Sequence, residues 1–238
     1  NWIQEKHGLS SIQYLDSIGL LDENTLIPHA IYASGYSGIQ DQTERDLEIL
    51  RDRKTAVIHC PLVYSRSGQA LESFGKYKRF GIRMCMGTDT FPPDPFENIR
   101  IGSAFSRHFD GEQPEDGYRS FFEAATMGGA DALGRPDLGR LAPGCRADFI
   151  AVCLDSFSIG VVDDPLYTIC MCASGKDVMH SVINGRTVLK DGKIPGLDYE
   201  QMEKDAQNYY NKLKQSFVDR SAFSAENFYD TSYPVKEG

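Results

Sequence analysis

The stretch Ile82-Arg-Met-Cys-Met-Gly-Thr-Asp-Thr90 decides the fold class, because a short apolar run ends in glycine just before an aspartate. Two similar units precede it, Leu26-Ile-Pro-His29 and Thr55-Ala-Val-Ile-His-Cys60, and each changes from apolar residues to a histidine near its end. The segments between these runs are long enough for one helix each. Strands that alternate with helices predict a parallel sheet, and in parallel barrels the C-terminal strand ends carry the chemistry. Asp89 and His29 are therefore the first candidate site residues.

Composition narrows the class of protein. The chain has 238 residues, of which 41% are hydrophobic and 25% charged, as is usual for a globular protein. A net charge of −9 without a basic stripe argues against nucleic-acid binding, and the apolar runs are too short to span a membrane. Six cysteines without a C-x-x-C pair, and no signal peptide, favour reduced thiols in a cytoplasmic protein.

The predicted secondary structure changes near Gly134, from helices that alternate with strands to short strands separated by turn residues. Before that residue, helical patterns are expected at 9–20, 41–53, 69–79, 95–107 and 117–133. After it, short strands are expected at 148–154, 167–172, 178–183 and 187–189. Asn184-Gly185 predicts a hairpin turn between two of these strands. The expected strand at 167–172 would place Cys170 and Cys172 on one face.

A final helix is expected at 198–218, with one apolar stripe formed by Tyr199, Met202, Ala206, Tyr209, Leu213 and Phe217. The chain is therefore divided into an α/β part at 1–134, a small β module at 135–192, and a C-terminal helix with its tail at 193–238. Because the tail at 219–238 is rich in aromatic residues, it is expected to dock on a surface, such as that of a partner subunit, and a homo-oligomer is expected.

Several stretches, taken in order, resemble the C-terminal part of the amidohydrolase superfamily, in its cytosine-deaminase and triazine-hydrolase branch. Each stretch is weak alone, but the ordered set is specific and covers most of residues 9–190. The matching stretches are Leu26-Ile-Pro-His-Ala-Ile-Tyr32, Val57-Ile-His-Cys-Pro61, Met86-Gly-Thr-Asp-Thr90, Ala124-Ala-Thr-Met-Gly-Gly-Ala-Asp-Ala-Leu-Gly134, Gly139-Arg-Leu-Ala-Pro-Gly-Cys-Arg-Ala-Asp148 and Val182-Ile-Asn-Gly-Arg-Thr-Val188.

The resemblance implies strands six to eight of a metal-dependent (β/α)₈ barrel, followed by a small β-sandwich module and a C-terminal helix. By this analogy Asp89 is a metal ligand and catalytic residue at the end of the eighth strand. His29 is the catalytic sixth-strand histidine, which contacts the hydrolytic water or the substrate. His59 falls at the end of the seventh strand, where it either supports neighbouring site residues or contacts the substrate. Arg66, in the loop after that strand, is a candidate substrate-binding residue, because its guanidinium could contact an anionic or carbonyl group of the substrate. The alternative is that Arg66 pairs with a nearby acidic residue.

The family's paired H-x-H histidines and its fifth-strand histidine and glutamate have no counterpart in the sequence. A complete barrel takes about 250 residues by itself. We therefore expect the chain to be a C-terminal fragment of a longer enzyme, whose remaining metal ligands lie upstream of Asn1. One divalent metal is implied, with zinc favoured over iron.

The implied reaction is hydrolytic deamination of a small nitrogen heterocycle by a metal-bound hydroxide. Dechlorination or cyclic-amide cleavage at the same site is the alternative reaction. Simpler readings of the residues also exist, since an aspartate after a strand is commonly a cap or turn residue, and a lone histidine is commonly a buried core residue. The alternative to an enzyme is that the chain is a non-catalytic scaffold fragment. No G-x-S-x-G, P-loop, G-x-G-x-x-G or H-x-E…P-C-x-x-C pattern occurs.

Overall fold

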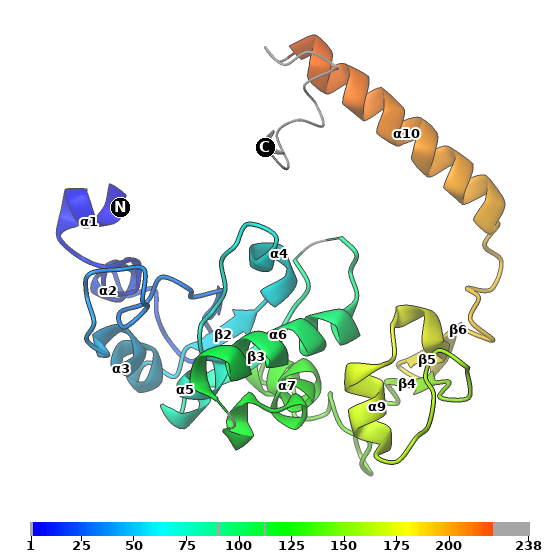
Figure 1. The fold of residues 1–238 in the computed structure, drawn as a ribbon, viewed down its shortest axis with the longest axis horizontal. Helices are drawn as coiled ribbons and strands as arrows, with labels where there is room; N and C mark the ends of the chain where they lie inside the picture. The colour runs from blue at the N-terminus through cyan, green and yellow to red at the C-terminus, as the bar shows by residue number, and fades with distance from the viewer. Residues whose placement is uncertain (1, 90, 112, 221–238) are drawn as a thin grey trace, which may run out of the picture. The chain divides into compact units, whose positions relative to one another are not determined.

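The computed structural model describes residues 2–89, 91–111 and 113–220. The chain forms two compact units, Asn1–Gly192 and Lys193–Gly238, and each is described by itself. The first unit contains a three-stranded parallel sheet with its helices and a separate three-stranded antiparallel sheet (Figure 1). The boundary expected between residues 134 and 135 stays a prediction.

Three strands form the parallel sheet in chain order, β1 (Leu26–Pro28), β2 (Ala56–His59) and β3 (Arg83–Met86). Leu26 pairs with Ala56, and Ala56 pairs in turn with Arg83. The central strand β2 is largely buried along its length, as expected for a parallel sheet covered on both faces. The strands predicted from the three apolar runs are therefore present, and their pairing is parallel.

Helices connect and cover these strands (Figure 1), and those that follow Ser10, Ser73 and Asp94 begin with a side chain that accepts from free backbone N–H groups. The Asp94 carboxylate accepts from the N–H groups of Phe96 and Glu97, and Pro95 occupies the first helical position. The helix expected at 69–79 begins only at Phe74, because the Ser73 hydroxyl accepts from the N–H of Lys76. The helices of this part of the unit are α1 (Trp2–His7), α2 (Ser11–Ser17), α3 (Arg45–Asp52), α4 (Pro61–Ser65), α5 (Phe74–Arg79), α6 (Pro95–Asp110), α7 (Tyr118–Glu123) and α8 (Gly129–Ala132).

The core lies between the sheet and the helices. Phe74 and Phe121 are both fully buried, and their rings stack with centroids 4.0 Å apart. A π-helical turn, Ala124–Gly128, joins α7 to α8 and packs against β3. A Cβ atom on Gly128 would lie only 2.5 Å from the carbonyl oxygen of Met84, so glycine permits this close approach.

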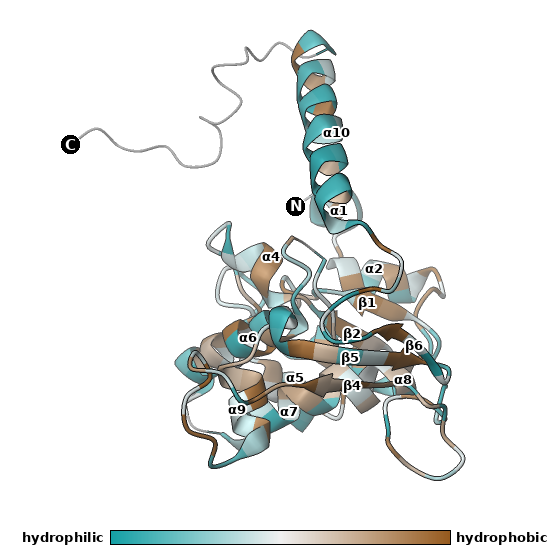
Figure 2. Ribbon diagram, turned by 90° about the vertical axis from the view of Figure 1, so that its right-hand side faces the viewer, coloured by the Kyte–Doolittle hydropathy of each residue, from teal (hydrophilic) through white to brown (hydrophobic). Residues whose placement is uncertain are grey.

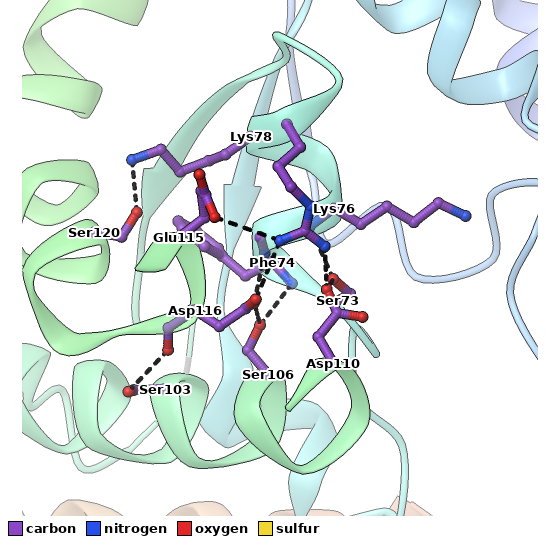
Figure 3. A network of polar contacts seen from close by, with 12 residues as sticks. Ser73, Phe74, Lys76, Lys78, Ser103, Ser106, Asp110, Glu115, Asp116 and Ser120 are labelled. Atoms are coloured by element: carbon purple, nitrogen blue, oxygen red, sulfur yellow. Dashed lines mark hydrogen bonds and ion pairs between the residues drawn. The ribbon is translucent and has the colours of Figure 1, made fainter. Parts of the chain in front are cut away.

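A buried polar network fixes α5 against α6 and the turn before α7 (Figure 3). The fully buried Asp116 accepts from the N–H of Gly75 at 2.8 Å and from the Ser106 hydroxyl. Arg79 forms ion pairs with Asp116 and with Asp110. Because each buried carboxylate here has charged or polar donors, the network positions α5 without leaving an uncompensated charge.

The second sheet is antiparallel and contains β4 (Phe149–Val152), β5 (Val178–Ile183) and β6 (Arg186–Leu189), in the order β4-β5-β6. Asn184 and Gly185 connect β5 to β6 with φ values of 50° and 75°, which confirms the predicted hairpin turn. Strand β4 is coloured as hydrophobic in Figure 2. Within residues 135–192, all of which the structure describes, there is one three-stranded sheet, so the second layer of the expected β-sandwich stays a prediction.

The strand predicted at 167–172 is wrong, because this segment lies in the helix α9 (Pro165–Met171). The Asp164 carboxylate caps this helix, accepting from the N–H of Leu166 at 2.9 Å, and Pro165 is its first residue. Cys170 is buried and Cys172 exposed, so the two thiols do not share a strand face. None of the six cysteines, all of which lie in the described ranges, forms a disulfide.

The second unit contains α10 (Tyr199–Arg220), a helix of 22 residues. It covers the helix expected at 198–218, and the tail at 221–238 lies outside the described residues. Across the described ranges, no helix combines the length and apolar character needed to cross a membrane.

Candidate active site

The carboxyl ends of the three parallel strands bring the predicted site residues to one edge of the sheet. His29 directly follows β1, and its N–H donates to the carbonyl of Ile58 in β2 at 2.8 Å. His59 is the last residue of β2 and pairs with Met86 at the end of β3. Asp89 follows three residues after Met86. The sequence therefore predicted correctly that these side chains come from neighbouring strand ends.

His29 and Asp89 contact each other directly. The Nε2 atom of His29 lies 3.2 Å from Oδ2 of Asp89, and their side chains are 18% and 57% exposed. Both residues have positive φ values, 66° for His29 and 45° for Asp89. This left-handed conformation is uncommon for residues other than glycine, and strained backbone of this kind gathers at functional sites. The geometry is that of a mostly enclosed imidazole paired with a carboxylate that is open to solvent.

The ring of His29 also contacts the ring of Tyr64. Their ring centroids lie 4.5 Å apart with an interplanar angle of 68°, an edge-to-face contact. The Nδ1 atom of His29 is buried and has no hydrogen-bond partner among the residues that the structure describes. A buried polar atom without a hydrogen-bond partner is unusual, so the Nδ1 atom of His29 can make one further polar contact.

Sequence reasoning did not identify Tyr64, because the sequence offers no signal beyond its place five residues after His59. The structure shows why it reaches the site. Buried Asn98 accepts from the N–H of Leu62 at 3.2 Å and donates to the carbonyl of Asp94 at 3.0 Å. This contact fixes the start of α4 directly after β2, and α4 then carries Tyr64 to the ring of His29.

His59 is a buried neutral side chain. Its ring packs against Phe74 and Phe121, with centroid distances of 5.8 and 6.1 Å. Burial, and to a smaller extent the electrostatic influence of the nearby His29, lowers the pKa of His59 from 6.5 to about 3. The imidazole is therefore uncharged at neutral pH. Burial, followed by the charge of Asp89, raises the pKa of the neighbouring Cys60 thiol to about 11, so this thiol is protonated.

Arg66 directly follows α4, and its side chain bonds to a second loop at this edge of the sheet. Its guanidinium donates to the main-chain carbonyl of Phe91, in the loop that follows Asp89. This contact joins the loop after β2 to the loop after β3. A role for Arg66 in substrate binding stays a prediction, as do the roles of His29, His59 and Asp89.

The described part of the chain does not contain a complete metal centre. No group of three or more histidine, cysteine, aspartate or glutamate side chains in those ranges is arranged to hold a metal ion. A catalytic zinc ion normally has three protein ligands and a water molecule. His29 and Asp89 offer only two donors, although the carboxylate oxygens and the unpartnered imidazole nitrogen are suitable ligand types.

Curated proteins similar to this chain include deaminases and an ethylaminohydrolase. A 5-methylthioadenosine/S-adenosylhomocysteine deaminase of Halobacterium salinarum is 25% identical over 215 residues, which are 89% of this chain and 48% of that protein. A hydroxydechloroatrazine ethylaminohydrolase of Pseudomonas sp. is 31% identical over 178 residues, or 72% of this chain and 37% of that protein. The chain thus spans about half the length, or less, of these curated relatives.

Solved structures show the same fold. A zinc-bound adenosine deaminase from Xanthomonas campestris matches with a TM-score of 0.80 and 20% identity, over 90% of this chain and 48% of that chain. A zinc complex of atrazine chlorohydrolase from Arthrobacter aurescens matches with a TM-score of 0.72 and 22% identity, over 87% and 45%.

The family pattern described as "Amidohydrolase family" matches residues 1–188, well over half of the sequence. This match agrees with the parallel sheet, with the site residues at its carboxyl edge, and with the similar structures. The chain belongs to the amidohydrolase family.

Proposed function

We propose that the chain is the C-terminal part of a metal-dependent hydrolase that cleaves a C–N bond of a small nitrogen heterocycle and releases ammonia or an amine. The contact between His29 and Asp89 at adjoining strand ends is the observation that supports this proposal most directly. The names of the similar proteins support the reaction class, since they include deaminases of adenosine derivatives and a triazine ethylaminohydrolase.

The two side chains have complementary tasks in such a reaction. Hydrolytic deamination adds the oxygen of water to a ring carbon, breaks the C–N bond, and moves a proton from the water to the leaving nitrogen. The exposed carboxylate of Asp89 can accept the proton from water and return it to the amine. His29, at 3.2 Å from that carboxylate, can hold the attacking water or the developing oxyanion by a hydrogen bond from Nε2.

A divalent metal, zinc in preference to iron, would lower the pKa of the water and polarise the group under attack. Because the described residues supply two donors, we assign Asp89 as one ligand and place the remaining ligands in sequence upstream of Asn1. Neutral His59 and the loop of Arg66 would then line the substrate side of the site. A cytoplasmic location is part of the proposal and is supported by six free cysteines.

The first experiment is the intact mass of the protein purified from its source, together with its metal content. A mass well above 26.6 kDa, with about one tightly held divalent metal per chain, is the expected result. In that protein Asp89→Asn should lower kcat for deamination at least about 100-fold and reduce bound metal. His180→Asn, a change on β5 in the antiparallel sheet, is the matched control and should leave both unchanged.

A second candidate applies to the chain on its own. The incomplete ligand set among the described residues favours a non-catalytic scaffold if the natural protein has a mass near 26.6 kDa. The chain would then bind no metal tightly and release no ammonia. A 26.6 kDa protein that binds one metal and deaminates a heterocycle would contradict the assignment of further ligands upstream.

A further inference from the structure

The backbone around His29 forms an uncommon turn. The N–H of Ala30 donates to the carbonyl of Pro28 at 2.8 Å, which closes a three-residue γ-turn with His29 at its centre. His29 and Ala30 follow each other with φ values of 66° and 48°, so two successive residues lie in the left-handed region. A γ-turn whose central residue has a positive φ is rare and strained, and neither residue is a glycine. Such backbone persists only where the surrounding structure holds it in place.

Helix α5 supplies a contact that holds this turn. The hydroxyl of Tyr77 donates to the main-chain carbonyl of Ala30 at 2.7 Å, a usual length for an O–H···O hydrogen bond. Tyr77 is 5% exposed and belongs to the main hydrophobic core, so packing fixes the position of its ring. Burial, followed by the charges of Asp46 and Glu72, raises the pKa of Tyr77, so the hydroxyl keeps its proton and remains a donor.

The turn determines where the imidazole of His29 points. The N–H of His29 is bound to the carbonyl of Ile58 at 2.8 Å, and the carbonyl of Ala30 is bound to α5, so the backbone is tied on both sides of the left-handed pair. A site histidine is commonly oriented by a hydrogen bond from its second ring nitrogen, but Nδ1 of His29 has no such partner among the described residues. The direction of the ring toward Asp89 therefore depends on the turn and on the ring contact with Tyr64.

We propose that Tyr77 is a positioning residue for His29, because its hydroxyl holds the strained turn in the conformation that directs the imidazole at Asp89. The inference rests on the proposed function, in which His29 holds the attacking water or the developing oxyanion. Tyr77 acts through the backbone of Ala30. Loss of its hydroxyl would displace His29, and a displacement of about 1 Å at a reacting centre can lower the rate about 100-fold.

Tyr77→Phe in the natural protein removes only the hydroxyl oxygen. It should lower kcat for deamination roughly 10- to 100-fold and leave KM within about threefold, because the substrate still binds while His29 is misplaced. Tyr118→Phe is the matched control, since it deletes a hydroxyl that donates to Asp164 at 2.8 Å in another part of the fold. This control should leave kcat within about twofold of the original.

Ala30→Gly supplies a rescue that depends on the turn. Glycine adopts a positive φ without steric cost, so the turn should hold without the hydroxyl. Tyr77→Phe/Ala30→Gly should therefore regain kcat to within about threefold of the unmodified protein. Ala30→Val should reproduce the loss with Tyr77 intact, because a β-branched residue strongly disfavours positive φ. This second variant tests the proposal even where Tyr77→Phe does not fold.

The NMR signal of the His29 imidazole gives a measurement that needs no activity. In protein with ¹³C-labelled histidine rings, His29→Gln assigns the signal, Tyr77→Phe should shift it, and Tyr77→Phe/Ala30→Gly should return it. These shifts in a protein without deaminase activity would contradict the proposed function and still support the positioning of His29. An active protein in which Tyr77→Phe changes neither kcat nor the signal would overturn the inference and leave the proposed function standing. A loss of kcat that Ala30→Gly does not restore would also overturn it, since the hydroxyl would then act by another route.

Discussion

The stability of the first unit should depend on pH through His59. Its imidazole is buried against Phe74 and Phe121, and its pKa in the folded chain is about 3 against an ordinary value of 6.5. Between these two values the unfolded chain holds a proton on His59 that the folded chain does not. The contribution is therefore fully present above about pH 6.5 and is lost as the pH falls toward 3.

The size of the effect follows from the difference in pKa. Each pH unit below the unfolded pKa favours the unfolded chain by about 1.4 kcal/mol until the folded pKa is reached. At about pH 4.5, two units below the ordinary value, His59 should lower the free energy of unfolding by about 3 kcal/mol relative to neutral pH. This is a large fraction of the total stability of a typical domain.

Urea unfolding of the wild type and of His59→Gln, at pH 7 and at pH 4.5, measures this contribution. The carboxylates titrate in both proteins, so the difference between the two pH dependences isolates His59. The variant should lose about 3 kcal/mol less than the wild type on acidification. His180→Gln, which removes a partly exposed histidine on β5, should behave as the wild type.

Equal pH dependence in the wild type and His59→Gln would refute the reasoning. The imidazole signals in an NMR titration of the wild type give an independent test that does not require a folded variant. They should stay those of neutral His59 down to about pH 4.5, and a midpoint near 6.5 would contradict the buried, neutral assignment.

Two further predictions concern backbone packing and capping. Gly128→Ala should lower the free energy of unfolding by about 2 kcal/mol, because the new Cβ would lie 2.5 Å from the Met84 carbonyl oxygen. Thermal unfolding measures this loss. The control is Gly129→Ala, whose Cβ would meet no atom within 4 Å, so that comparing the two variants separates the clash from the effect of alanine on helix propensity. Asp164→Ala should cost about 1 to 2 kcal/mol, because α9 loses its N-terminal cap, whereas the neighbouring Asp163→Ala should stay within about 0.5 kcal/mol. Equal losses for the members of either pair would contradict the explanation.

The parallel sheet and the site edge were predictable because local pattern and chemistry agree in them. Each of the three strands lies in a short apolar run with a histidine or aspartate at its end or within three residues after it, and the hairpin at Asn184-Gly185 is a local signal as well. The segment 167–172 was misread because a short apolar run has no distinct period. Its helix is decided by Asp164 and Pro165, which lie just before the run.

Contacts between distant parts of the chain could not be predicted in this way. Tyr64 reaches His29 only because Asn98, more than thirty residues away, fixes the start of α4. The buried position of Asp116 likewise depends on donors from α5 and α6. Such contacts are set by tertiary packing, for which a single sequence carries no periodic signal.

The strand order β1-β2-β3 has a consequence for how such a sheet can be made and divided. Every strand pairs only with its neighbours in the chain, so each new unit of strand and helix is added at the growing edge. During synthesis the earlier pairings need no rearrangement when a later strand arrives. For the same reason, a contiguous stretch cut from a sequential sheet retains all of its internal strand pairings. Division of such a sheet affects only its two outermost strands.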